Sequence, residues 1–125
     1  MLLFDILSSI VKVNDVLLIV RNNAAISEIR SNSLNIKQKE KWITIGDNDG
    51  PAHMHLDSEL VKSCKFVKEA KPERTSYSVR FYDEKGERVI AAFFTKMYDE
   101  NNHLDLGRQK VYDDLNRMFG SETEF

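Results

Sequence analysis

Two histidines form the clearest chemical pattern in the chain. His53 and His55 lie two residues apart in a segment that reads AHMHL. In a β-strand such residues point to the same face, so we expect both imidazoles on one face and Ala52, Met54 and Leu56 on the other. Imidazole titrates near neutral pH and binds metal ions. The pair is therefore the first candidate site, and the alternative is two solvated histidines at the end of a strand.

A basic residue stands in a second alternating segment, TSYSVRFY. If Val79 and Phe81 face the core, Arg80 faces outward with Ser78 and Tyr82. A guanidinium pairs with a carboxylate through two hydrogen bonds, so this face suits a planar ligand that carries carboxylates. The alternative is an ordinary solvated sheet face.

The segment VIAAFF, residues 89–94, is apolar on both faces of the strand that it predicts. One face must pack on helices. The other must cover a ligand, a second subunit or more protein, because a large apolar patch is rarely left in water.

The sequence gives little support for a zinc site or for the common catalytic motifs. A structural zinc site needs four ligands, and only Cys64 and His103 could join the histidine pair, at spacings that do not favour zinc. A catalytic zinc on His53 and His55 with Asp57 stays open as a weaker hypothesis. The chain has neither a G-x-S-x-G motif nor a glycine-rich phosphate loop. We therefore predict no catalytic residues and expect a binding protein rather than an enzyme.

Composition narrows the class of protein. The chain has 125 residues and a formal net charge of −2, which argues against duplex nucleic acid as a partner. A single cysteine excludes an internal disulfide and favours a reducing compartment. The apolar N-terminal run is broken by polar residues and is shorter than the ~20 residues of a membrane span. We expect one domain over residues 1–125, located in the cytoplasm and away from membranes.

Hydrophobic periodicity predicts the elements. Leu3, Ile6, Leu7 and Ile10 have helical spacing at the N-terminus, and residues 103–119 predict a second helix. In that helix Leu104, Val111, Leu115 and Met118 form one apolar stripe, with Tyr112 and Phe119 beside it. The other expected elements are strands at residues 16–21, 24–30, 41–45, 52–56, 65–70, 75–82 and 87–96, a possible strand around residues 34–36, a short helix at 58–62, and a frayed end at 121–125. The fold class is α+β, a mostly antiparallel sheet of about seven strands with N- and C-terminal helices packed on it.

The order of these segments resembles a known family. GPAHMHLD is followed by CKFV, by TSYSVRFYDEKG, by FFT and by the terminal helix. This order is similar to the haem-iron-utilisation proteins of the ChuX, HutX and HemS types, over residues 16–119 and as a single repeat unit.

The resemblance implies a haem or related tetrapyrrole held in a cleft against the sheet. It implies His53 or His55 as the ligand of the haem iron and Arg74 or Arg80 near the propionates. It also implies that two units pair, here as a homodimer. Our first hypothesis is a haem carrier or storage protein. The alternatives are a non-enzymatic homodimeric interaction module of the same fold without haem and, third, a metal enzyme.

Overall fold

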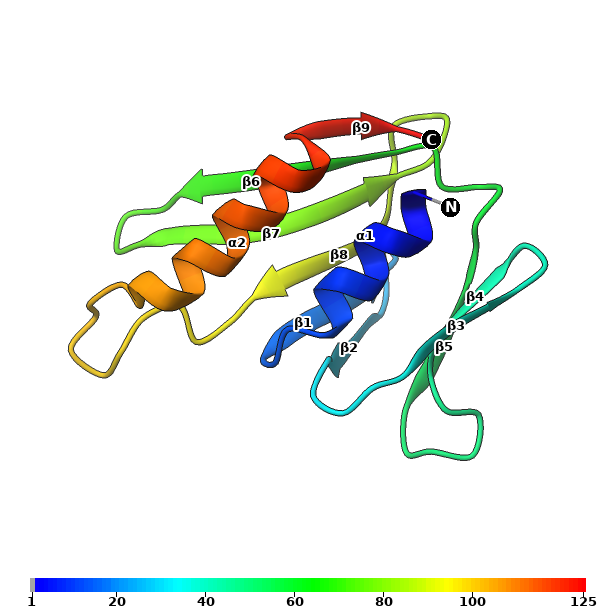
Figure 1. Cartoon of the computed structure of the whole chain (residues 1–125), viewed down its shortest axis with the longest axis horizontal. Helices are drawn as coiled ribbons and strands as arrows, with labels where there is room; N and C mark the ends of the chain where they lie inside the picture. Colours follow the sequence, from blue (N-terminus) through cyan, green and yellow to red (C-terminus); the bar gives the residue numbers. More distant parts are fainter. Residues whose placement is uncertain (1) are drawn as a thin grey trace.

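The computed structural model describes residues 2–125, which fold into two antiparallel sheets and two helices (Figure 1). The elements, in chain order, are α1 Leu2–Val11, β1 Val16–Arg21, β2 Ile26–Arg30, β3 Ile36–Lys39, β4 Trp42–Gly46, β5 His53–Asp57, β6 Ser63–Ala70, β7 Thr75–Tyr82, β8 Arg88–Phe94, α2 Leu106–Phe119 and β9 Glu122–Glu124. The predicted α+β class is confirmed, with nine strands in the described residues rather than about seven.

The strands divide between a large sheet and a small sheet. The large sheet has the order β2-β1-β8-β7-β6-β9, and the small sheet has the order β3-β4-β5. All the pairings are antiparallel. The segment from β3 to β5 therefore leaves the large sheet after β2 and forms a layer of its own, and β6 returns to the large sheet (Figure 1).

The β7–β8 hairpin is closed by one carboxylate. Asp83 Oδ1 accepts hydrogen bonds from the backbone N–H groups of Lys85 and Glu87, each at 2.9 Å. Gly86 has a φ of 77°, a region that a side chain disfavours. The turn residues DEKG thus fix the register of β7 and β8.

Both helices lie on the same side of the large sheet (Figure 1). Leu3, Ile6, Leu7 and Ile10 of α1 are at most 1% exposed and belong to one buried cluster. That cluster also contains residues from the helix-facing side of the large sheet and from the inner side of the small sheet: Val16, Leu18, Ile43, Ile45, Leu56, Val79, Phe81, Ile90 and Ala92. The helix α1 therefore shares its core with both sheets.

Helix α2 packs through only part of the predicted apolar stripe. Tyr112 is fully buried, whereas Val111 and Met118 are 40% and 69% exposed. The helix begins after Asp105, whose side chain accepts a hydrogen bond from the Arg108 N–H. Leu104 and Leu115 pack against the core as predicted. The prediction was wrong for Val111 and Met118, because the large Tyr112 ring occupies the space over the sheet. In the described chain, neither helix is long and apolar enough to cross a membrane.

Two further expectations were wrong. Residues 58–60 form a turn, and residues 61–62 have no regular structure, so the short helix is absent. Asp57 ends β5 instead of capping a helix, although its Oδ1 accepts a hydrogen bond from the Glu59 N–H at 3.0 Å. The C-terminal residues are not frayed, because β9 pairs with β6. Glu122 is opposite Lys65, and the next two residues of β9 are paired in the same way. Such pairing is non-local and leaves no mark in the short sequence ETE.

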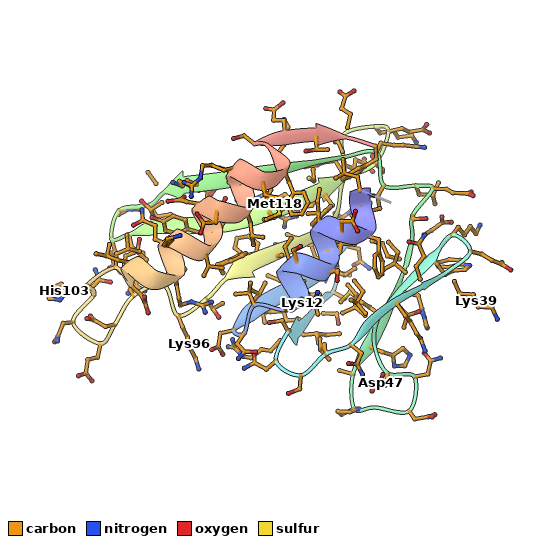
Figure 2. All side chains as sticks on the ribbon, viewed as in Figure 1. Lys12, Lys39, Asp47, Lys96, His103 and Met118 are labelled. Carbon is orange, nitrogen blue, oxygen red and sulfur yellow. The ribbon has the colours of Figure 1, made fainter. Side chains whose placement is uncertain are left out.

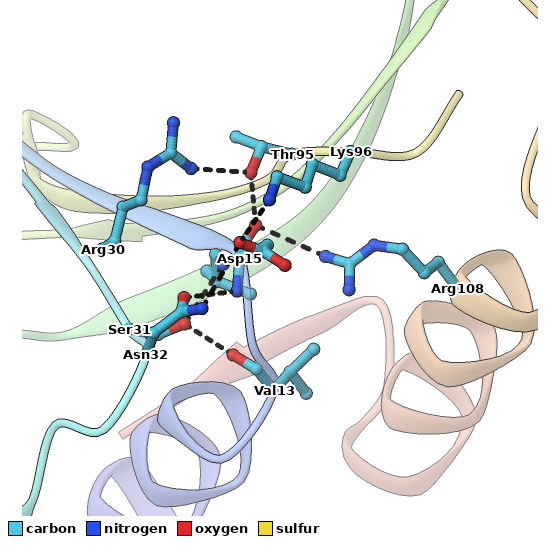
Figure 3. A network of polar contacts seen from close by, with 9 residues as sticks. Val13, Asp15, Arg30, Ser31, Asn32, Thr95, Lys96 and Arg108 are labelled. Atoms are coloured by element: carbon cyan, nitrogen blue, oxygen red, sulfur yellow. Dashed lines mark hydrogen bonds and ion pairs between the residues drawn. The ribbon is translucent and has the colours of Figure 1, made fainter. Parts of the chain in front are cut away.

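A polar network ties three connections together around Asp15 (Figure 3). The Asp15 carbonyl accepts hydrogen bonds from the Thr95 N–H at 3.0 Å and from an Arg108 Nη at 3.3 Å. Its carboxylate is 3.3 Å from Lys96 Nζ, and Lys96 lowers the pKa of this carboxyl despite the opposing effect of desolvation. The network joins the α1–β1 turn to the segments after β2 and after β8.

We predict that Tyr112 is the anchor of α2. Its ring lies 5.1–5.6 Å from those of Phe66, Tyr77 and Phe94, and its hydroxyl donates to the Ser78 carbonyl at 2.8 Å. Tyr112→Phe should lower the free energy of unfolding by about 1 kcal/mol. Tyr112→Ala should lower it by about 3–5 kcal/mol, because a large ring leaves a cavity.

Urea unfolding followed by circular dichroism measures both changes. The control is Tyr82→Phe, which removes a hydroxyl that makes no hydrogen bond in the described part of the chain and should change little. Equal effects of the two Tyr→Phe substitutions would contradict the role of the buried hydroxyl.

Candidate functional site

The histidine pair lies on the outer face of the small sheet. Both His53 and His55 are exposed, whereas Leu56 is 6% exposed and faces the core. The two ring centroids are 5.2 Å apart, with the rings at 67° to each other. The prediction that both imidazoles share one face is thus confirmed, and that face belongs to β3, β4 and β5.

The ring of His55 is oriented by its neighbour across the sheet. Thr44 and His55 are register partners, and Thr44 Oγ1 lies 2.9 Å from His55 Nδ1. Thr44 is 7% exposed, so its hydroxyl has little water to exchange with. Because this hydrogen bond occupies Nδ1, the nitrogen left for another partner is Nε2.

The backbone beside His53 depends on a glycine. Gly46 pairs with His53 in register and has a φ of 89°. A Cβ added at Gly46 would lie 2.4 Å from the Ala52 carbonyl oxygen, a backbone atom that cannot move aside alone. The loop between β4 and β5 returns at this close distance only because position 46 has no side chain.

An open groove of about 580 Å³ lies over this face and includes His55. Its floor is Thr44, and the exposed indole of Trp42 lies beside it. Lys37 and Lys39 line the groove from β3. A volume of this size is typical of small-molecule sites.

Register places the groove residues in rows across the small sheet. One row is Lys37, Thr44 and His55, and the next begins with Lys39 and Trp42. Figure 2 shows Lys39 on the outer side of this sheet, away from both helices. Sequence analysis missed the two lysines and Trp42, although the alternation IKQK and the single tryptophan were signals that could have found them.

The charges at the end of the groove are partly neutralised. Lys41 Nζ is 3.3 Å from an Asp57 carboxylate oxygen and 5.4 Å from the centroid of the Trp42 ring. Asp57 is thereby paired with a lysine. Glu40 is the acidic residue that lines the groove itself.

The two candidate arginines lie on the large sheet. Arg80 donates to Ser78 Oγ at 3.1 Å, pairs with Glu69 at 3.4 Å and lies over the Phe93 ring at 5.6 Å. Arg74 lies over the Tyr98 ring at 4.6 Å. Neither arginine lines the groove, so the structure of one copy does not bring the arginines and the histidine pair together.

The remaining zinc candidates are also apart from the pair. Cys64 is fully buried, and desolvation raises the pKa of its thiol to about 11, so it stays protonated at neutral pH. His103 lies in an exposed loop at the opposite end of the molecule from Lys39 (Figure 2). Within residues 2–125, no group of three or more His, Cys, Asp or Glu side chains is arranged to hold a metal ion.

The fold agrees with those of known proteins. ChuX has a TM-score of 0.76 and 13% identity over 94% of this chain and 69% of its own. An Agrobacterium tumefaciens protein has a TM-score of 0.75 and 23% identity over 92% of this chain and 65% of its own. PhuS from Pseudomonas aeruginosa, described as a haem-binding protein, has a TM-score of 0.71 and 14% identity over 89% of this chain and 31% of its own.

A sequence comparison addresses the family directly. No curated protein matches the chain. A protein-family model matches residues 4–117, nearly the whole chain. Together with the ChuX fold, this match shows that the chain belongs to the haem-iron-utilisation family that includes ChuX.

Proposed function

We propose that the chain binds haem or a related tetrapyrrole in the groove over the small sheet, as a carrier or storage protein, with His55 as the ligand of the iron. The observation that carries this proposal is that His55 lines the groove with Nδ1 held by Thr44. When Nδ1–H donates to Thr44 Oγ1, Nε2 has the lone pair that an iron ion needs. His53 lies one row further along β5 and does not line the groove.

The donor set fits such a ligand. Haem would supply an iron that the His55 imidazole would bind, and histidine is a common protein ligand of haem iron. The volume of the groove, about 580 Å³, suits a molecule of this class, and Trp42 offers an aromatic surface to a flat ring. ChuX and PhuS are both described as haem-binding proteins, which supports the same function for a member of their family.

The resemblance also implies Arg74 or Arg80 as a propionate partner, and this stays a prediction. Arg80 is held by Glu69 and Ser78 on the face of the large sheet opposite the helices. A guanidinium in that position would meet a ligand of the groove only if another copy brought it there.

We also propose that the chain forms a homodimer through the large sheet. The face of the large sheet that carries Arg80 has no helix over it in the described chain (Figure 1). Leu17 pairs with Phe93, and Ile19 pairs with Ala91, so three half-buried apolar side chains lie on this open face around Ala91, which is fully buried. We infer that a second copy covers the open face, because the family resemblance implies paired units and β8 is apolar on both sides.

The open face also favours a second candidate function. If the groove holds no tetrapyrrole, we propose a non-enzymatic interaction module that binds a second copy through this apolar face. The hemin titration below separates the two functions, because only the first requires His55.

Hemin added to the purified protein should give a shifted Soret band. His55→Ala should abolish the shift and weaken hemin binding about tenfold or more, because the iron loses its protein ligand. His53→Ala and the remote control His103→Ala should leave the shift in place. A spectrum that responds to His53→Ala instead of His55→Ala would refute the assignment, and no shift in the unmodified protein would refute haem binding.

The homodimer predicts the effect of a charge on the open face. Phe93→Asp should weaken self-association about thirtyfold or more, because an apolar anchor at the centre of an interface becomes a buried carboxylate. The matched control is Leu60→Asp, since Leu60 is 62% exposed on the turn before β6. Sedimentation velocity checks both variants, with circular dichroism to confirm folding. A monomer at every concentration of the unmodified protein would contradict the dimer.

A further inference from the structure

Two lysines of the groove have no partner among the described residues. The ammonium groups of Lys37 and Lys39 make no ion pair or hydrogen bond there, although both side chains are exposed over the groove. Two other lysines do form ion pairs, Lys41 with Asp57 and Lys68 with Asp113. An unpaired ammonium group in a concave site is available to an anion that enters the site.

Both ammonium groups lie within reach of a ligand bound at His55. Lys37, Thr44 and His55 follow one another across three neighbouring strands. Strands lie about 4.8 Å apart, so the Lys37 backbone is about 10 Å from that of His55. A lysine side chain can cover much of this distance, and a flat ligand over Thr44 would extend from the imidazole towards the lysines.

The indole of Trp42 adds a recognition surface for a flat ring. It pairs with Lys39 in register and is 45% exposed, which is unusual for the largest apolar side chain. Lys41 is placed over the ring and is held there by Asp57. The indole is therefore positioned by contacts of its own before any ligand binds.

The nearby acidic groups do not cancel the two lysines. Glu40 is the one carboxylate that lines the groove, against two unpaired ammonium groups. Lys37 also borders a separate polar hollow with Asp47 and Asp49 but forms no ion pair with them. The Asp47 carboxylate instead accepts hydrogen bonds from the Asn35 side-chain amide.

We propose that Lys37 and Lys39 bind the carboxylates of a planar aromatic ligand that lies against Trp42, so that the groove selects tetrapyrroles by their acid groups. This inference rests on the proposed function, since it concerns the same groove, but it does not require iron. The ligand class is a flat aromatic ring system that carries at least two free carboxylates. The alternative role of the lysines is protective, because β3 is an edge strand and charged residues discourage pairing with another chain.

Trp42 is the single tryptophan of the chain, so its fluorescence reports occupancy of the groove directly. The experiment titrates the protein with iron-free protoporphyrin IX and with its dimethyl ester, which has the same ring without free carboxylates. Protoporphyrin IX should quench Trp42 at lower concentration than the ester. Raising the salt concentration should weaken binding of the acid more than binding of the ester.

The variant Lys37→Gln/Lys39→Gln should weaken binding of protoporphyrin IX at least about tenfold and leave binding of the ester nearly unchanged. The matched control is Lys12→Gln/Lys85→Gln, which removes the same charge from exposed lysines outside the groove. This control also corrects for the change in net charge. Circular dichroism verifies that both double variants are folded.

The outcomes separate this inference from the proposed function. Equal affinities for acid and ester, or no effect of the groove variant, would overturn the inference and leave the lysines as edge protection, even if hemin still binds at His55. Lysine-dependent binding of protoporphyrin IX without a His55-dependent hemin spectrum would support the inference and refute iron ligation. Absence of quenching by either porphyrin would overturn the inference.

Discussion

Burial of the inner face of the small sheet is the constraint on which the candidate site depends. Ile43 and Ile45 are fully buried, and Leu56 is 6% exposed, in the core that they share with α1. Successive strand residues alternate between faces, so burial of these three forces Thr44 and His55 outward. A shift of β5 by one residue would turn the His55 imidazole into the core and expose Leu56. Burial of the inner face thus determines which side chains point outward, although the core does not contact them.

Local patterns predicted the parts of the fold that local forces determine. The alternation in AHMHL placed His53 and His55 on one face, and DEKG marked the β7–β8 turn, because side-chain period and turn chemistry act over a few residues. Pairing between distant segments was not predictable in the same way. The strand β9 exists because β6 offers it a free edge, and Val111 stays exposed because Tyr112 fills the space under α2.

The groove escaped prediction for the same reason. Lys37, Trp42 and His55 come from three strands, and their common face follows from the register of β3, β4 and β5. Each residue alone is unremarkable in sequence, since lysines on an edge strand commonly protect it. Arg80 shows the reverse case. Its outward direction was correctly predicted, but its strand belongs to the other sheet, and the alternation within a strand cannot tell which sheet the strand will join.

The lysines of the groove lie on the small sheet, whereas Arg80 lies on the large sheet. Which of these basic side chains can bind the carboxylates of a ligand therefore depends on how two copies assemble. The groove of one copy already holds an imidazole, an indole and two unpaired ammonium groups, so it can position a flat acid without a guanidinium. Arg80 lies among apolar residues of the open face, where a second copy would bury it together with Glu69. A buried ion pair of this kind is costly to break, so a dimer would hold Arg80 in its pair rather than release it to a ligand. We therefore propose the lysines of β3, rather than Arg80, as the partners of the carboxylates, with Arg80 held at the interface of the proposed dimer.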